Sequence, residues 1–161
     1  MDEAHRKQAA IEYRRLHEAR RRLNDRLMNR LDRRQVEVAA RTLGFWHEGI
    51  LVFDSEEDSA VLVDFAIHAT GEGGRNAPRG LLDDGALGLD DDERRLLAGM
   101  VHARFGLYRV DEVLPGFGVR VRNLFSKQSY DLADMGLSET ARPDVAFLGR
   151  LFDAGVVGEC V

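Results

Sequence analysis

The sequence is poor in cysteine, and its single cysteine, Cys160, is the next-to-last residue. One thiol excludes a disulfide framework and a cysteine-based zinc site within one chain. A nucleophilic cysteine needs a neighbouring base in a fixed geometry, which a chain end rarely supplies. We therefore expect a passive thiol at Cys160.

Long apolar runs are also missing. No stretch approaches the roughly 20 apolar residues that a membrane helix needs, and the first residues, MDEAHRKQAAIEYRR, lack the apolar core of a secretory signal. The hydrophobic content of 44% and charged content of 32% are ordinary for a globular protein. We expect a cytoplasmic protein with one domain plus an appendage, long enough to bury a core.

The local motifs of common enzyme classes are absent as well. There is no Gly-x-Ser-x-Gly, kinase or Rossmann signature, and GEGGR at 71–75 lacks the lysine of a phosphate-binding loop. Asp64 and His68 are spaced i,i+4, but a metal site would need a third ligand. We predict no catalytic residue, metal or cofactor. An enzyme stays the third alternative, because sites assembled from distant residues leave no local pattern.

Charge of one sign is concentrated at one end. Residues 1–45 hold 12 Lys and Arg against 7 Asp and Glu, whereas residues 46–161 hold 11 against 21. The first segment therefore carries +5 and the remainder −10. Only the N-terminal segment is suited to an anionic partner.

The N-terminal segment has no Pro or Gly from Glu3 to Leu43, and Gly44 follows as a helix stop. This predicts one long helix, or two joined near Asp32, over residues 1–44, attached to a body at 45–161. One narrow helical stripe carries Ala9, Tyr13, Leu16, Leu23, Leu27, Leu31 and Val38. Such a stripe is typical of a seam against another helix.

Two functions compete for this helix. The favoured one is an interaction or structural protein that self-associates, as a homodimer, or binds a protein partner through Leu16, Leu23, Leu27 and Leu31. The alternative for the stripe is that it folds back onto the chain's own body. The second function is nucleic-acid binding, with candidate anion contacts at Arg14, Arg15, Arg21, Arg22 and Arg26, but interspersed acidic residues and the −10 body oppose it.

The middle of the chain predicts short elements. A strand is expected near Ile50–Phe53 with Trp46 as an anchor beneath it. Residues 58–68 fit either a strand or a helix, and the capping pair of Ser55 and Asp58 favours the helix. Residues 71–80, GEGGRNAPRG, predict a loop. A second helix is expected from Asp90, with Leu96, Leu97, Met100 and Val101 facing inward.

Residues 105–134 predict an antiparallel meander or small barrel-like sheet with strands near 105–114, 117–124 and 128–134. With a small helical segment packed on it and the long N-terminal helix, this predicts an α+β fold. A Pro115-Gly116 turn sets Leu114 opposite Phe117 and Val110 opposite Val121, and a Ser126-Lys127 turn sets Val121 opposite Leu132. The other face then carries Arg109, Asp111, Arg120, Arg122 and Asp131. With acidic residues interleaved, we expect a solvated face of ion pairs rather than an anion platform.

The segment FGLYRVDEVLPGFGVRVRNLFSKQSYDL, followed by DMGLSET, resembles uncharacterised bacterial proteins that often carry a C-terminal SEC-C motif. The matching positions are Phe105, Leu107, Tyr108, Val110, Pro115, Gly116, Gly118, Leu124 and Ser138. Asn123 replaces the Asp of that pattern, and Ser126-Lys127 replaces its Thr-Gly. The resemblance implies a bacterial origin and a helical part packed on a small meander. It implies no activity, and without the cysteine-rich motif it implies no zinc.

Overall fold

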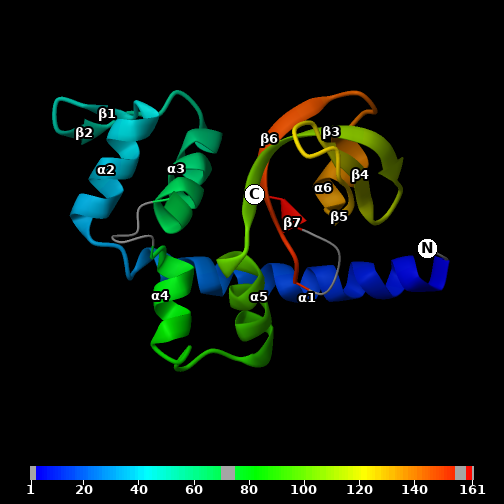
Figure 1. Cartoon of the computed structure of the whole chain (residues 1–161), viewed down its shortest axis with the longest axis horizontal. Coiled ribbons are helices and arrows are strands. Elements are labelled where there is room, and N and C mark those ends of the chain that lie inside the picture. The colour runs from blue at the N-terminus through cyan, green and yellow to red at the C-terminus, as the bar shows by residue number, and fades with distance from the viewer. Residues whose placement is uncertain (1–2, 70–74, 155–158, 161) are drawn as a thin grey trace. The chain divides into compact units, whose positions relative to one another are not determined.

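The computed structural model describes residues 3–69, 75–154 and 159–160 (Figure 1). Its elements are α1 (Glu3–Met28), α2 (Arg33–Leu43), β1 (Trp46–His47), β2 (Ile50–Leu51), α3 (Glu56–Ala69), α4 (Ala77–Asp83), α5 (Asp91–Val101), β3 (Arg104–Leu114), β4 (Gly118–Asn123), β5 (Ser129–Ala133), α6 (Met135–Thr140), β6 (Ala146–Phe152) and β7 (Glu159–Cys160). The α+β class that the sequence predicts is confirmed.

The chain divides into two compact units. Unit 1 comprises Met1–Arg20 and Asp91–Val161, and unit 2 comprises Arg21–Asp90. Helix α1 contributes residues to both units. The helix at 1–44 and body at 45–161 that the sequence indicates stay a prediction.

The N-terminal segment forms two helices because Asp32 starts a new one. The Asp32 carboxylate accepts a hydrogen bond from the Gln35 backbone N–H at 2.7 Å, and the Gln35 side chain accepts one from the Asp32 N–H at 2.8 Å. This reciprocal capping satisfies two backbone donors at the start of α2. Gly44 ends α2 in the left-handed conformation, with φ at 80°. Of the two arrangements that the sequence left open, two helices is the observed one.

Unit 2 packs α2 against α3. Ala39 and Ala40 of α2 meet Leu62 and Ala66 of α3, and a ring of partly buried side chains surrounds them: Leu31, Val36, Leu43, Phe45, Trp46 and Phe65. The predicted helix at 58–68 is confirmed as α3. At its start, the Asp58 carboxylate accepts hydrogen bonds from the backbone N–H groups of Asp54 and Ser55 at 2.8 and 3.1 Å.

The loop predicted at 71–80 is wrong in its last four residues, because α4 begins at Ala77. The Asn76 side chain caps this helix by accepting from the Arg79 N–H at 3.0 Å, and Pro78 lies in the first turn, where its missing N–H costs nothing. Residues 71–74 lie outside the described part of the chain.

Unit 1 contains a five-stranded antiparallel sheet in the order β5-β4-β3-β6-β7 (Figure 1). One face is the core, which buries Tyr108, Val110, Val119, Val121, Leu132 and Leu151, and Leu137 and Ala141 pack on it from α6 and the residue that follows it. Helix α5 buries Leu96, Leu97 and Met100 as expected, whereas Val101 is only partly buried. Gly99 of α5 approaches the Asp153 carbonyl so closely that a Cβ would lie 2.2 Å from it.

The predicted β3–β4 pairing is confirmed up to Val110 and shifts beyond it. Val110 pairs with Val121, but a bulge between Val110 and Glu112 sets Leu114 opposite Gly118 instead of Phe117. A bulge inserts one unpaired residue, so the turn contains three residues. The Phe117 N–H closes this turn by donating to the Leu114 carbonyl at 3.0 Å.

The predicted β4–β5 pairing is wrong by two residues. Val121 pairs with Tyr130, and Val119 with Leu132. The turn is longer than predicted because the Asn123 side chain accepts from the N–H groups of Phe125 and Ser126, both at 2.9 Å. A shift of two keeps every side chain on its face, so Val110, Val121 and Leu132 share one core as predicted.

Candidate interaction site

The leucines of the predicted helix seam are buried within the single chain. Leu16, Leu23 and Leu27 are 2%, 0% and 0% exposed, and Leu31 packs at the edge of the unit 2 core. The leucines therefore present no exposed stripe in the single chain. A homodimer is not tested by this burial and stays a prediction.

The arginines proposed as anion contacts are partly engaged in ion pairs. In unit 1, Arg15 Nη2 lies 3.1 Å from Asp92 Oδ1, and in unit 2, Arg22 Nη2 donates to Asp90 Oδ2 at 2.8 Å. Arg14, Arg21 and Arg26 are exposed. Guanidiniums that already bind carboxylates offer less charge to phosphates, which weakens the support for nucleic-acid binding.

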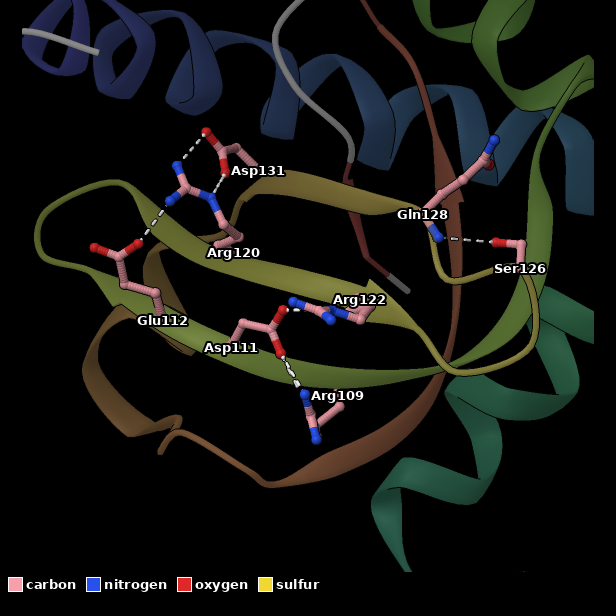
Figure 2. A network of polar contacts seen from close by, with 8 residues as sticks. All are labelled: Arg109, Asp111, Glu112, Arg120, Arg122, Ser126, Gln128 and Asp131. Carbon is pink, nitrogen blue, oxygen red and sulfur yellow. Dashed lines mark hydrogen bonds and ion pairs between the residues drawn. The ribbon is translucent and has the colours of Figure 1, made fainter.

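The solvent face of β3, β4 and β5 carries two clusters of ion pairs (Figure 2). Asp111 accepts from Arg109 Nη2 at 3.0 Å and from Arg122 Nε at 2.8 Å. Arg120 donates to Asp131 Oδ1 at 2.6 Å and to Glu112 Oε2 at 2.7 Å. All three guanidiniums of the predicted charged face are thus paired with carboxylates, as the interleaved sequence indicated. Two details differ from simple alternation: Arg120 lies opposite Asp131 of β5, and the bulge brings Glu112 of β3 onto this face opposite Arg120.

These ion pairs change the pKa values of Asp111 and Arg120. Partial desolvation raises the pKa of Asp111, but hydrogen bonds from Arg109 and Arg122 and the charges of both guanidiniums outweigh it, so the pKa lies below its ordinary value. The hydrogen bond and the charge of Asp131 raise the pKa of Arg120. Protonation of Asp111 at low pH therefore removes interactions that stabilise the folded chain.

Replacing Asp111 with asparagine should reduce the loss in free energy of unfolding that the chain shows as the pH falls. The folded-state pKa of Asp111 is lowered from about 3.9 in the unfolded chain, so its contribution is present above pH 4 and is lost as the pH falls through the folded value. Urea unfolding between pH 6 and pH 2 measures this loss. Arg122→Gln should reduce the same loss by removing one partner. A loss as large in Asp111→Asn as in the unchanged chain would contradict the assignment.

Beside the ion pairs, the same face of the sheet is apolar. Phe105 and Leu107 of β3 lie opposite Arg150 and Leu148 of β6. Phe105 and Leu148 are 58% and 65% exposed, and the Arg150 guanidinium lies 5.5 Å from the Phe105 ring centroid. The sequence reasoning missed this patch because it did not predict β6. Alternation back from Arg109 would have placed Leu107 and Phe105 on this face.

A cleft of about 1400 Å³ also opens in unit 1. Its walls come from α5, β3, the end of β6 and the hairpin of β4 and β5, and include Arg95, His102, Arg104, Tyr130, Phe152 and Asp153. Basic, acidic and aromatic groups are mixed along the walls, which matches no single ligand class.

The described residues also give no metal site. No group of three or more His, Cys, Asp or Glu side chains among them could hold a metal ion. In unit 2, His68 Nε2 lies 3.9 Å from Asp64 Oδ1, so the i,i+4 pair forms a contact within α3 without a third ligand.

Comparison with known proteins gives the family of the chain. The sequence profile of a family of unknown function (DUF7986) matches residues 7–157. The chain belongs to this family. A search of curated proteins and a search of solved structures found no match.

Membership of DUF7986 bears on two expectations from the sequence. An uncharacterised family is confirmed, whereas the match gives no link to SEC-C-motif proteins, so that part of the resemblance is unsupported. In the described part of this DUF7986 chain no helix is long and apolar enough to cross a membrane. Cys160 lies in β7, and its side chain is outside the described part.

Proposed function

We propose that this DUF7986 protein is an interaction protein that self-associates through the outer edge of β6. The observation that carries the proposal is the outer edge of β6 at residues 146–149, which no described strand covers, beside the exposed apolar side chains of Leu148 and Phe105. The surface differs from the N-terminal helix that the sequence favours, because the leucines of that helix are buried.

One edge of β6 has backbone groups that could pair with another strand. Its residues from Ala146 to Leu151 pair with β3, and β7 pairs on the other side only with Leu151 and Phe152. In the part of the chain that the structure describes, residues 146–149 thus have no strand on their outer side. Natural edges are usually protected by lysine or proline, and the run Ala-Phe-Leu-Gly at 146–149 contains neither.

The edge is complementary to itself. If a second copy pairs antiparallel about Leu148, Leu148 lies opposite Leu148 of the second copy, and Ala146 lies opposite Arg150 of the second copy. No like charges face each other, and Phe147 meets a glycine on the other face. Closed two-fold pairs of this kind are the commonest assemblies of soluble proteins, so the proposed partner is a second copy.

Light scattering on the intact chain tests the proposal. At about 50 μM, a concentration at which micromolar association is nearly complete, we expect twice the chain mass of 18.1 kDa. Leu148→Asp should give 18.1 kDa, because paired aspartates at the two-fold axis would repel each other and lose the apolar contact.

The matched control is Leu87→Asp, which makes the same change at a leucine of unit 2 that is 79% exposed, and it should keep the double mass. Circular dichroism should show that both variants are folded. A monomeric intact chain would refute self-association, and a Leu148→Asp variant that keeps the double mass would refute the β6 edge as its site.

A further inference from the structure

The second exposed apolar surface of the molecule lies in unit 2, and we name it the hairpin patch: Ile50, Leu51, Val52 and Phe53. These consecutive side chains are 64%, 41%, 40% and 38% exposed. Successive side chains of an extended strand point to opposite faces, so Ile50 and Val52 lie on one side of the hairpin and Leu51 on the other. Exposed apolar side chains that gather in this way often mark an interaction site.

The hairpin patch is held in position by the core beneath it. The Val52 N–H donates to the Phe45 carbonyl at 2.9 Å, and the Phe53 ring meets the Phe45 ring edge-on with centroids 5.5 Å apart. Phe45 in turn packs against the core of α2 and α3. A surface that is ordered before binding loses less conformational entropy when a partner docks.

The surroundings of the hairpin patch are acidic. Residues 42–74 contain seven Asp and Glu and no Lys or Arg. The basic group beside them, Arg41, lies with its guanidinium 5.5 Å from the ring centroid of Trp46, the strand partner of Leu51, and it is paired with Glu37 at 2.8 Å. Glu48 precedes the patch, Asp54 follows it directly, and Glu57 is exposed on the first turn of α3. Beside Phe53 there is a shallow pocket lined by Asp54, Ser55 and Ser59. An aromatic wall beside a carboxylate and two hydroxyls suits the apolar stem and cationic tip of a lysine or arginine side chain.

We propose that the hairpin patch docks a basic segment of a partner protein, in which leucine-like side chains alternate with lysine or arginine. Opposite charges at the rim steer such a segment and fix its register, while the apolar side chains contribute the affinity. The carboxylates would repel nucleic acid and anionic lipid surfaces. The short strand β2 offers only Ile50 and Leu51 for backbone pairing, so side-chain contacts dominate.

Selection from a random peptide display library on the immobilised intact chain tests this proposal. We expect enriched peptides that combine Leu, Ile or Phe with Lys or Arg. The double variant Ile50→Ser/Leu51→Ser should bind them at least ten-fold more weakly, and so should Glu48→Lys/Asp54→Lys, which leaves the apolar side chains in place. Because rim charges are screened by salt, binding should weaken from 50 to 500 mM NaCl.

Leu87→Ser, an exposed leucine of unit 2 outside the patch, serves as the matched control and should bind as the intact chain does. Thermal melting checks that each variant is folded. Acidic consensus peptides, an empty selection, or equal binding by the patch variants would overturn the proposal. So would a change of oligomeric mass in Ile50→Ser/Leu51→Ser, which would assign the patch to a second copy, or patch-dependent binding of an oligonucleotide.

Discussion

Replacing Leu23 with aspartate is expected to unfold much of the chain. Leu23 lies in α1 with no exposed surface, so the new carboxylate would be buried and a well-packed leucine lost. The two effects together destabilise by about 5 kcal/mol, against a total stability of about 5–15 kcal/mol for a domain. Thermal melting followed by circular dichroism should show a decrease of at least about 10 °C, or no cooperative transition.

Ile11→Asp is the matched control for this result, because Ile11 lies on the same helix and is 62% exposed. It should melt within a few degrees of the unchanged chain. A Leu23→Asp variant that keeps its melting temperature and only changes from dimer to monomer would restore the helix seam as the partner surface and refute the buried arrangement.

Replacing Gly118 with alanine is expected to disrupt the pairing of β4 and β5. A Cβ at this position would lie 1.9 Å from the Leu132 carbonyl oxygen and 2.7 Å from the Asp134 nitrogen. Both atoms belong to the backbone, so they move only if the strands separate. We expect a loss of about 3 kcal/mol or more, measured by urea unfolding, together with faster amide exchange in β4 and β5.

Gly80→Ala is the control, because the same substitution at this position should raise the stability instead of lowering it. Gly80 lies inside α4, and no heavy atom comes within 4 Å of a Cβ there. Alanine should stabilise this helix by about 1 kcal/mol, because glycine is the poorer helix former. If Gly118→Ala unfolds at the same urea concentration as the unchanged chain, the close approach of β4 to β5 is wrong.

Turn and cap chemistry made several elements predictable from sequence. Asp32 marked the break between α1 and α2, and Pro115-Gly116 marked the β3–β4 connection. The side-chain faces of β4, of β5 and of β3 up to Val110 followed from alternation, which a shift of two residues does not disturb. The β4–β5 turn was not predicted correctly from its residues. The Asn123 side chain lengthens it by accepting two backbone hydrogen bonds, which the residues Ser126-Lys127 alone do not indicate.

The sequence pattern of the leucine stripe could not predict that the stripe is buried in the single chain. A stripe of Leu16, Leu23 and Leu27 is the same sequence whether a partner or the chain itself covers it, so the burial of these side chains has to come from the structure. The Asp111 bulge has no local signal either, since it depends on how the end of β3 meets β4. Strand β6, which carries the proposed interaction edge, pairs with β3 some forty residues earlier in the chain, beyond the reach of a local pattern.

The discontinuity of unit 1 sets an order of events during synthesis. Unit 2 is complete when Asp90 has been made, but the first 20 residues belong to a unit whose remaining parts begin at Asp91. The pairing of Arg15 with Asp92 therefore waits for more than seventy further residues, which ribosomes add in about 4–15 s. During that interval Leu16 has no completed core to enter, and the nascent helix carries an uncovered apolar side that chaperones for emerging chains can bind.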